Sequence, residues 1–167
     1  ARVPSDGKAH AWYARALQSL GRWVEAAAQY DSALAYLPRP EPGLVLSRAA
    51  LADSLTGAAG ALAEVERGLA RLGPSLSLEL SAVDLEARLG RTEAALARLD
   101  RLQASGGDPV TLGWQRGTLL SQAGRGLDAC VAWSDALDAL DRVATRHSLS
   151  ASQQHQRELL RQALDHQ

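Results

Sequence analysis

The sequence contains no Phe, Met or Ile among its 167 residues, and its single cysteine is Cys130. One cysteine cannot form an internal disulfide, so the cysteine count does not indicate a compartment. No apolar run approaches the ~18–20 residues needed to span a bilayer. The formal net charge is −1, from 18 basic and 19 acidic residues, which gives no electrostatic argument for nucleic acid. These absences argue against a membrane span and against a nucleic-acid partner.

The residues that are present favour helices. Hydrophobic residues make up 46% of the chain, and Ala and Leu supply most of them. Both lose little conformational freedom in a helix, and small Ala side chains let helices approach closely. The length is that of about one domain. We therefore expect one all-α domain over residues 1–167.

A short segment recurs along the chain at a nearly constant spacing. It reads Leu-Gly-Arg-Trp at 20–23, with copies at 89–92 and 123–126 and a weaker one at 55–58. The anchor positions 21, 56, 90 and 124 lie 35, 34 and 34 residues apart. A period of about 34 residues is typical of helix–turn–helix repeats. Glycine suits the tight turn, because a left-handed conformation costs it nothing.

The residues around each anchor follow one helical pattern. Five residues after the anchor stands Ala, nine after it a large apolar residue, and seven before it a residue that is small in three cases of four. Offsets of three and four trace one face of a helix, so the pattern predicts helix pairs in which small residues admit the large ones. The three sets are Ala26, Ala61, Ala95 and Ala129; Tyr30, Val65, Leu99 and Trp133; and Ala14, Ala49, Val83 and Gly117.

The copy at residues 7–40 carries the fullest pattern, which consists of Ala11 to Leu17, Gly21, Trp23, Ala26, Tyr30, Ala33 and Pro38. It resembles the tetratricopeptide repeat (TPR) family, and the resemblance extends to about residue 141. The implied fold is a right-handed α-solenoid of four TPR-like helix hairpins plus a C-terminal capping helix. The repeats are expected at about 7–40, 42–75, 76–109 and 110–143, with the cap at about 150–166. Glu86 departs from the family pattern, because it occupies a normally apolar position.

We expect helices near 8–20, 23–37, 43–55, 58–72, 76–89, 92–105, 110–123, 126–145 and 151–165. The linker 38–42 holds three alternating prolines and is expected to be non-helical throughout. The last helix departs from the repeat and places Leu159, Leu160 and Leu164 at helical spacing, as the end of a solenoid requires. A partner-binding tail is the alternative interpretation of this segment.

No residue set indicates catalysis, so the chain is expected not to be an enzyme and to carry no cofactor. His147 and His155 are eight residues apart, and no carboxylate or cysteine joins them at metal-ligand spacing. Cys130 follows Ala129 on an inward helix face and is predicted to be a buried, inert thiol. A metal site is likewise not expected.

Protein binding is better supported, through the resemblance. In TPR proteins the first helix of each pair lines a concave groove. Because aromatic and Arg side chains dominate binding hot spots, Trp12 and Trp114 are the leading candidates, with packing against neighbouring helices as the alternative for both. Trp23 and Trp133 are expected in the core. The groove residues carried over by position are Trp12, Arg15, Gln18, Asp53, Asp84, Arg88, Trp114, Gln115, Thr118 and Gln122.

The function expected from this resemblance is a scaffold that holds a partner peptide or segment in the groove. The family's carboxylate clamp is not expected, because the chain has no Asn, and Ala11 and Arg15 stand where the first clamp Lys and Asn would be. The alternative is a structural or self-association module within a longer solenoid. The Pro38-to-Pro42 linker, with segments 68–74 and 94–100, is similar to uncharacterised bacterial repeat proteins that tend to carry export signals. A periplasmic or otherwise exported location is therefore expected, with the cytoplasm as the alternative.

Overall fold

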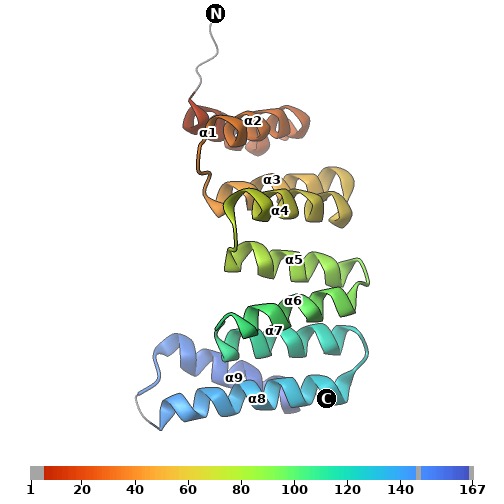
Figure 1. The fold of residues 1–167 in the computed structure, drawn as a ribbon, viewed down its shortest axis with the longest axis vertical. Helices are drawn as coiled ribbons and strands as arrows, with labels where there is room; N and C mark the ends of the chain where they lie inside the picture. The colour runs from red at the N-terminus through yellow and green to blue at the C-terminus, as the bar shows by residue number, and fades with distance from the viewer. Residues whose placement is uncertain (1–5, 146–147, 166–167) are drawn as a thin grey trace, which may run out of the picture. The chain divides into compact units, whose positions relative to one another are not determined.

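The computed structural model describes residues 6–145 and 148–165, and within these ranges the chain forms nine α-helices and no β-strand (Figure 1). The helices are Gly7–Ser19 (α1), Trp23–Tyr36 (α2), Pro42–Thr56 (α3), Ala58–Leu72 (α4), Leu76–Arg88 (α5), Thr92–Ala104 (α6), Pro109–Gln122 (α7), Gly126–Ala144 (α8) and Ala151–Asp165 (α9). The predicted helices are confirmed, with ends that agree to within one residue.

One expectation about the linker is wrong. Pro42 is the first residue of α3, whereas the whole segment 38–42 was predicted to be non-helical. Proline is well suited to the first position of a helix, because its missing N–H would have no partner there and its φ angle is already helical. The non-helical part of the linker therefore ends at Glu41, the N-cap residue.

The contacts divide the chain into two compact units, with the division between Leu89 and Gly90. Unit 1 contains α1 to α5 and unit 2 contains α6 to α9. The division falls in the turn between α5 and α6, inside the third of the predicted repeats. A single domain over 1–167 stays a prediction, and the two units are described separately below.

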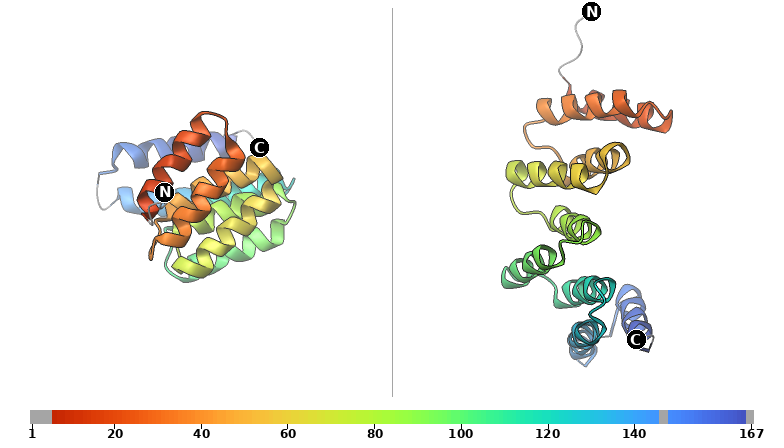
Figure 2. Two further views of the ribbon diagram at one scale, coloured as in Figure 1. Left: turned by 90° about the horizontal axis from the view of Figure 1, so that it is seen from above. Right: turned by 90° about the vertical axis from the view of Figure 1, so that its right-hand side faces the viewer.

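In unit 1, consecutive helices form antiparallel pairs that pack on one another. Helices α1 and α2 form one pair and α3 and α4 the next, while α2 contacts α3 and α4 contacts α5 (Figure 2). Tyr30 of α2 is buried in one core cluster with Ala14 of α1, and Val65 of α4 is buried in another with Ala49 of α3. The burial of each such large side chain stabilises the unit by roughly 1.5–3 kcal/mol. The predicted pairing of small with large residues thus forms the core.

The turns between paired helices depend on glycine. Gly21, Gly57, Gly90 and Gly124 have φ angles of 73°, 78°, 71° and 74°, a left-handed conformation that strains other residues. The predicted glycine turns are confirmed. In the second repeat it is Gly57, one place later than the regular anchor, that takes this role.

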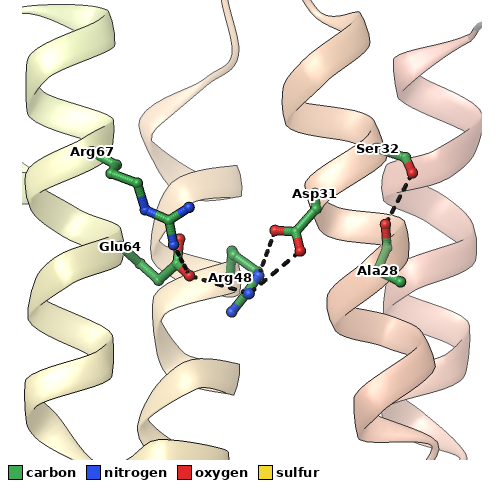
Figure 3. A network of polar contacts seen from close by, with 6 residues as sticks. All are labelled: Ala28, Asp31, Ser32, Arg48, Glu64 and Arg67. Carbon is green, nitrogen blue, oxygen red and sulfur yellow. Dashed lines mark hydrogen bonds and ion pairs between the residues drawn. The ribbon is translucent and has the colours of Figure 1, made fainter.

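A partly buried ionic network joins three helices of unit 1 (Figure 3). Arg48 of α3 lies 2.8 Å from Asp31 of α2 and 3.1 Å from Glu64 of α4. Only 14% of the Arg48 side chain and 8% of the Glu64 side chain are exposed. Glu64 also pairs with Arg67, on the next turn of α4. Because Arg48 bonds carboxylates on both sides, it ties α2 to α4 through α3.

The end of α2 is completed by a residue from the following hairpin. Arg71 of α4 donates hydrogen bonds to the main-chain oxygens of Leu34 and Leu37, the latter at 2.6 Å. The last carbonyls of a helix have no partner within the helix, and a cation at this end also interacts favourably with the helix dipole. Arg71 therefore satisfies acceptors that α2 cannot satisfy itself.

In unit 2, α7 and α8 form the closest pair, α6 contacts α7, and α9 packs on α8. Trp133 of α8 lies over Gly117 of α7, where an added Cβ atom would be 2.3 Å from the indole nitrogen. Trp133 is 5% exposed, so its predicted place in the core is confirmed. Helix α9 is anchored by the buried Leu160 and by an ion pair of 2.8 Å between Arg157 and Asp141.

Candidate binding face

The predicted groove residues of unit 1 lie on α1, α3 and α5, each of which is the first helix of a predicted repeat. The side of these helices that carries Trp12, Arg15, Asp53, Asp84 and Arg88 is called the first-helix face below. Two hollows open on it, and each contains a subset of the predicted residues.

The first hollow is built around Trp12 and has a volume of about 320 Å³. The Trp12 side chain is 70% exposed, so packing against a neighbouring helix, the alternative for this residue, does not describe it. The Arg15 guanidinium carbon lies 5.4 Å from the centre of the Trp12 ring, within the range of a cation–π interaction. The lining residues of this Trp12 hollow are Lys8, Ala11, Trp12, Arg15, Leu37, Arg39, Glu41, Gly43 and Leu44.

The second hollow lies between α3 and α5 and has a volume of about 280 Å³. It brings together Asp53, Asp84 and Arg88, which were assigned to the groove from two different repeats. Arg88 donates two hydrogen bonds to the Asp53 carboxylate, at 2.7 and 2.9 Å. These hydrogen bonds lower the pKa of Asp53 below its usual value, and the Asp53 carboxylate raises the pKa of Arg88. The Asp84 carboxylate also raises the pKa of Arg88, so the charges that line this Asp53–Arg88 hollow interact with one another.

In unit 2 a third hollow, of about 270 Å³, lies between α7 and α9. It contains the predicted residues Trp114 and Gln115, together with Gln156 and Leu159 of α9. Trp114 is half-buried, and its ring lies 6.2 Å from that of Trp133 at 37°. Trp114 therefore both packs against a neighbouring helix and lines a hollow. No charged side chain lines this Trp114 hollow.

The other predicted groove residues have local partners or lie apart from these three hollows. Gln18 accepts a hydrogen bond of 2.9 Å from the Tyr30 hydroxyl. Thr118 donates one to the main-chain oxygen of Trp114. Gln122, the last residue of α7, is exposed. The binding role of the whole set stays a prediction.

Sequence reasoning misplaced one aromatic residue and missed two lining residues. Trp23 is 42% exposed and not part of the core, because it is the first residue of α2 and precedes the buried stripe that starts at Ala26. Arg39 and Glu41 line the Trp12 hollow from the linker, and the linker lies outside the repeat pattern. The signal in the sequence that could have found them is the alternation of these two charged residues with the three prolines of the linker.

The titratable residues singled out from the sequence form no reactive cluster in the part of the chain that the structure describes. No group of three or more His, Cys, Asp or Glu side chains within these residues could hold a metal ion. His155 is exposed, and His147 lies outside the described residues. Cys130 is half-buried, not fully buried as predicted.

The fold is similar to that of several solved structures. YrrB, described as a TPR protein with an unusual peptide-binding site, has a TM-score of 0.61 and 14% identity, over 81% of this chain and 69% of YrrB. A TPR protein from Parabacteroides merdae has a TM-score of 0.62 and 15% identity, over 96% and 60% of the two chains. This is the tetratricopeptide repeat fold. MamA shares it, with a TM-score of 0.61 and 11% identity over 95% of this chain and 88% of MamA.

The TPR resemblance and the all-α solenoid class are thus confirmed at the level of the fold. No family model matches the sequence, and no curated protein does. Within the described residues, no helix of this TPR fold has the length and apolarity required to cross a membrane. The exported location stays a prediction.

Proposed function

We propose that this chain is a non-enzymatic, protein-binding scaffold that holds a segment of a partner protein on its first-helix face. The observation that carries the proposal is Trp12, a large indole left 70% exposed in the wall of a hollow. An exposed aromatic side chain in a concave site is typical of binding hot spots, because it offers much contact area at a small entropic cost.

The hollows of unit 1 fit a chain segment better than a compact small ligand. Both are open, lie on the same face, and have volumes of about 320 and 280 Å³, near the lower limit of about 300 Å³ for small-molecule sites. An extended or helical segment could place one side chain in each. The peptide-binding description of YrrB belongs to a protein of the same fold and is consistent with this mode.

Selection from a displayed random peptide library against the folded chain tests the proposal. Enriched peptides should bind at least about tenfold more weakly to Trp12→Ala than to the unaltered chain, as for a hot-spot residue. Tyr13→Ala is the matched control, because Tyr13 is the next residue of α1, is 51% exposed and does not line the hollow. Peptides whose affinity is the same for both variants would place binding elsewhere. A library that yields no binder, together with concentration-dependent light scattering, would favour the self-association module.

A further inference from the structure

The Trp12 hollow combines an apolar floor with a cationic rim. The floor is formed by Ala11, Leu37 and the buried Leu44, beside the Trp12 ring. The rim carries three exposed cations, Lys8, Arg15 and Arg39. The floor favours a large apolar side chain, since its contact surface would be removed from water.

The charge of the rim is not neutralised from within. Its one carboxylate is Glu41, and no carboxylate of the described residues lies within ion-pair distance of Lys8, Arg15 or Arg39. In the Asp53–Arg88 hollow, by contrast, the guanidinium is already bonded to Asp53. The Trp12 hollow therefore keeps an excess of two positive charges on a chain whose formal net charge is −1.

We propose that the Trp12 hollow binds an acidic peptide segment with one large apolar side chain, which enters between α1 and the start of α3 while flanking carboxylates meet Lys8, Arg15 and Arg39. The inference rests on the proposed scaffold function and specifies its partner. Charge complementarity of this kind selects partners and raises their association rate. The recognised groups are side-chain carboxylates, so a free C-terminus is not required.

Nucleic acid is the other anionic macromolecule to consider, and the hollow fits it less well. Tight binding to a phosphate backbone draws on about 6–10 phosphate contacts, whereas this rim offers three cations on a slightly acidic chain. The floor beside Trp12 is aliphatic, formed by Ala11, Leu37 and Leu44, which suits an apolar side chain better than a base that stacks on aromatic rings. A peptide supplies both the anchor and the charges.

The probe for the test is a fluorescein-labelled peptide, acetylated and amidated at its ends, in which one Leu is flanked on both sides by Glu residues. Two control peptides replace the Glu residues by Lys, or the Leu by Gly. Fluorescence anisotropy on the full chain should show at least about tenfold tighter binding of the acidic probe than of either control. Raising the salt from about 50 mM to about 500 mM should weaken it several-fold, because exposed charges are then screened.

Charge-reversal variants test the rim. Lys8→Glu and Arg39→Glu should each weaken the acidic probe about threefold or more, and together about tenfold or more, with binding of the Lys-flanked peptide gained in the double variant. Arg161→Glu is the matched control: Arg161 is exposed on α9 and lines none of the hollows described above, so the affinity should not change. Circular dichroism checks that all variants keep their helical content.

Equal or tighter binding of the Lys-flanked peptide to the unaltered chain would overturn the acidic specificity. If that binding still required Trp12, the proposed scaffold function would remain. Failure of the acidic probe to bind would overturn the inference alone, provided that library peptides bind in a Trp12-dependent way. Displacement of the bound probe by single-stranded oligothymidylate at equal charge concentration would replace the peptide by nucleic acid.

Discussion

The hairpins α3–α4 of unit 1 and α7–α8 of unit 2 place different side chains between their helices. In unit 1, the largely buried Arg48 of α3 pairs with the buried Glu64 of α4 and with the half-exposed Asp31 of α2. In unit 2, the indole of Trp133 fills the space above Gly117 and contacts Trp114. Unit 2 also has ion pairs between helices, but the partners of Arg125 are well exposed. Hairpins of the same geometry can thus be stabilised by an ion pair between the helices or by a large side chain packed on glycine.

The difference has a physical consequence for how each unit tolerates change. A buried ionic group is costly when it loses its partner, because it remains desolvated without compensation. Where an aromatic ring packs on glycine, a change of volume in either residue destabilises the fold. A smaller ring residue leaves a cavity, and a methyl group added to the glycine causes overpacking. The four predictions below run from the largest expected effect to the smallest.

Trp133→Ala should lower the free energy of unfolding by about 3–5 kcal/mol. Trp133 is only 5% exposed, so removal of its indole ring leaves a cavity in the core. Trp23→Ala, at the half-exposed first residue of α2, should lower the free energy of unfolding by only about 1 kcal/mol. Urea denaturation followed by circular dichroism measures both. Similar losses for the two variants would contradict the placement of Trp133 in the core and Trp23 outside it.

Arg48→Met should lower the free energy of unfolding by about 3 kcal/mol, the low end for a broken buried pair, because Arg67 still pairs with Glu64. The control is Arg125→Met in unit 2, where exposed partners predict a loss of about 0–1 kcal/mol. Adding Glu64→Leu to Arg48→Met should recover part of the loss, since no buried charge then remains. If the double variant were no more stable than Arg48→Met alone, the desolvated Glu64 carboxylate would not be the cause of the loss.

Gly117→Ala should lower the free energy of unfolding by about 1–3 kcal/mol, through overpacking against Trp133. The first hairpin pairs Ala14 with Tyr30 at the equivalent positions, so Trp133→Tyr in the same chain should relieve the overpacking. Gly43→Ala is the control, because an added Cβ atom meets nothing within 4 Å there. Thermal unfolding of the four proteins would show whether the two changes compensate.

Asp53→Asn should have the smallest effect and should depend on pH. The folded-state pKa of Asp53 is lowered by its hydrogen bonds from Arg88, so its ionised form stabilises the fold above the unfolded pKa of about 3.9. This contribution is lost as the pH falls through the lowered folded-state pKa. Urea denaturation at several pH values should therefore show that the free energies of unfolding of the unaltered chain and of Asp53→Asn converge below about pH 4. A difference that grows in acid would contradict the depressed pKa.

The sequence predicted the helices well because their signals are local. The glycine turns and the prolines mark many of the helix ends, and the period of about 34 residues places the hairpins. The pattern of small and large residues also predicted that Ala14 and Tyr30 belong to one core cluster. Pro42 was misplaced although its location at the start of α3 follows a known preference.

The candidate site was less predictable because it depends on contacts between repeats. Position in the repeat placed Asp53 and Arg88 on one face, but their ion pair requires the spacing of α3 and α5. The Trp12 hollow needs Arg39 from a linker outside the repeat, and the Trp114 hollow needs α9. Such long-range packing leaves no periodic signal in the sequence.

The hydrogen bonds from Arg71 to Leu34 and Leu37 have a practical consequence for dissecting this chain. A fragment that ends in the proline linker would retain α1 and α2 but would present bare carbonyl oxygens at the end of α2. The shortest fragment that keeps the hydrogen bonds to the end of α2 therefore extends through α4. The C-terminal end of the first hairpin is thus completed by side-chain donors of the second.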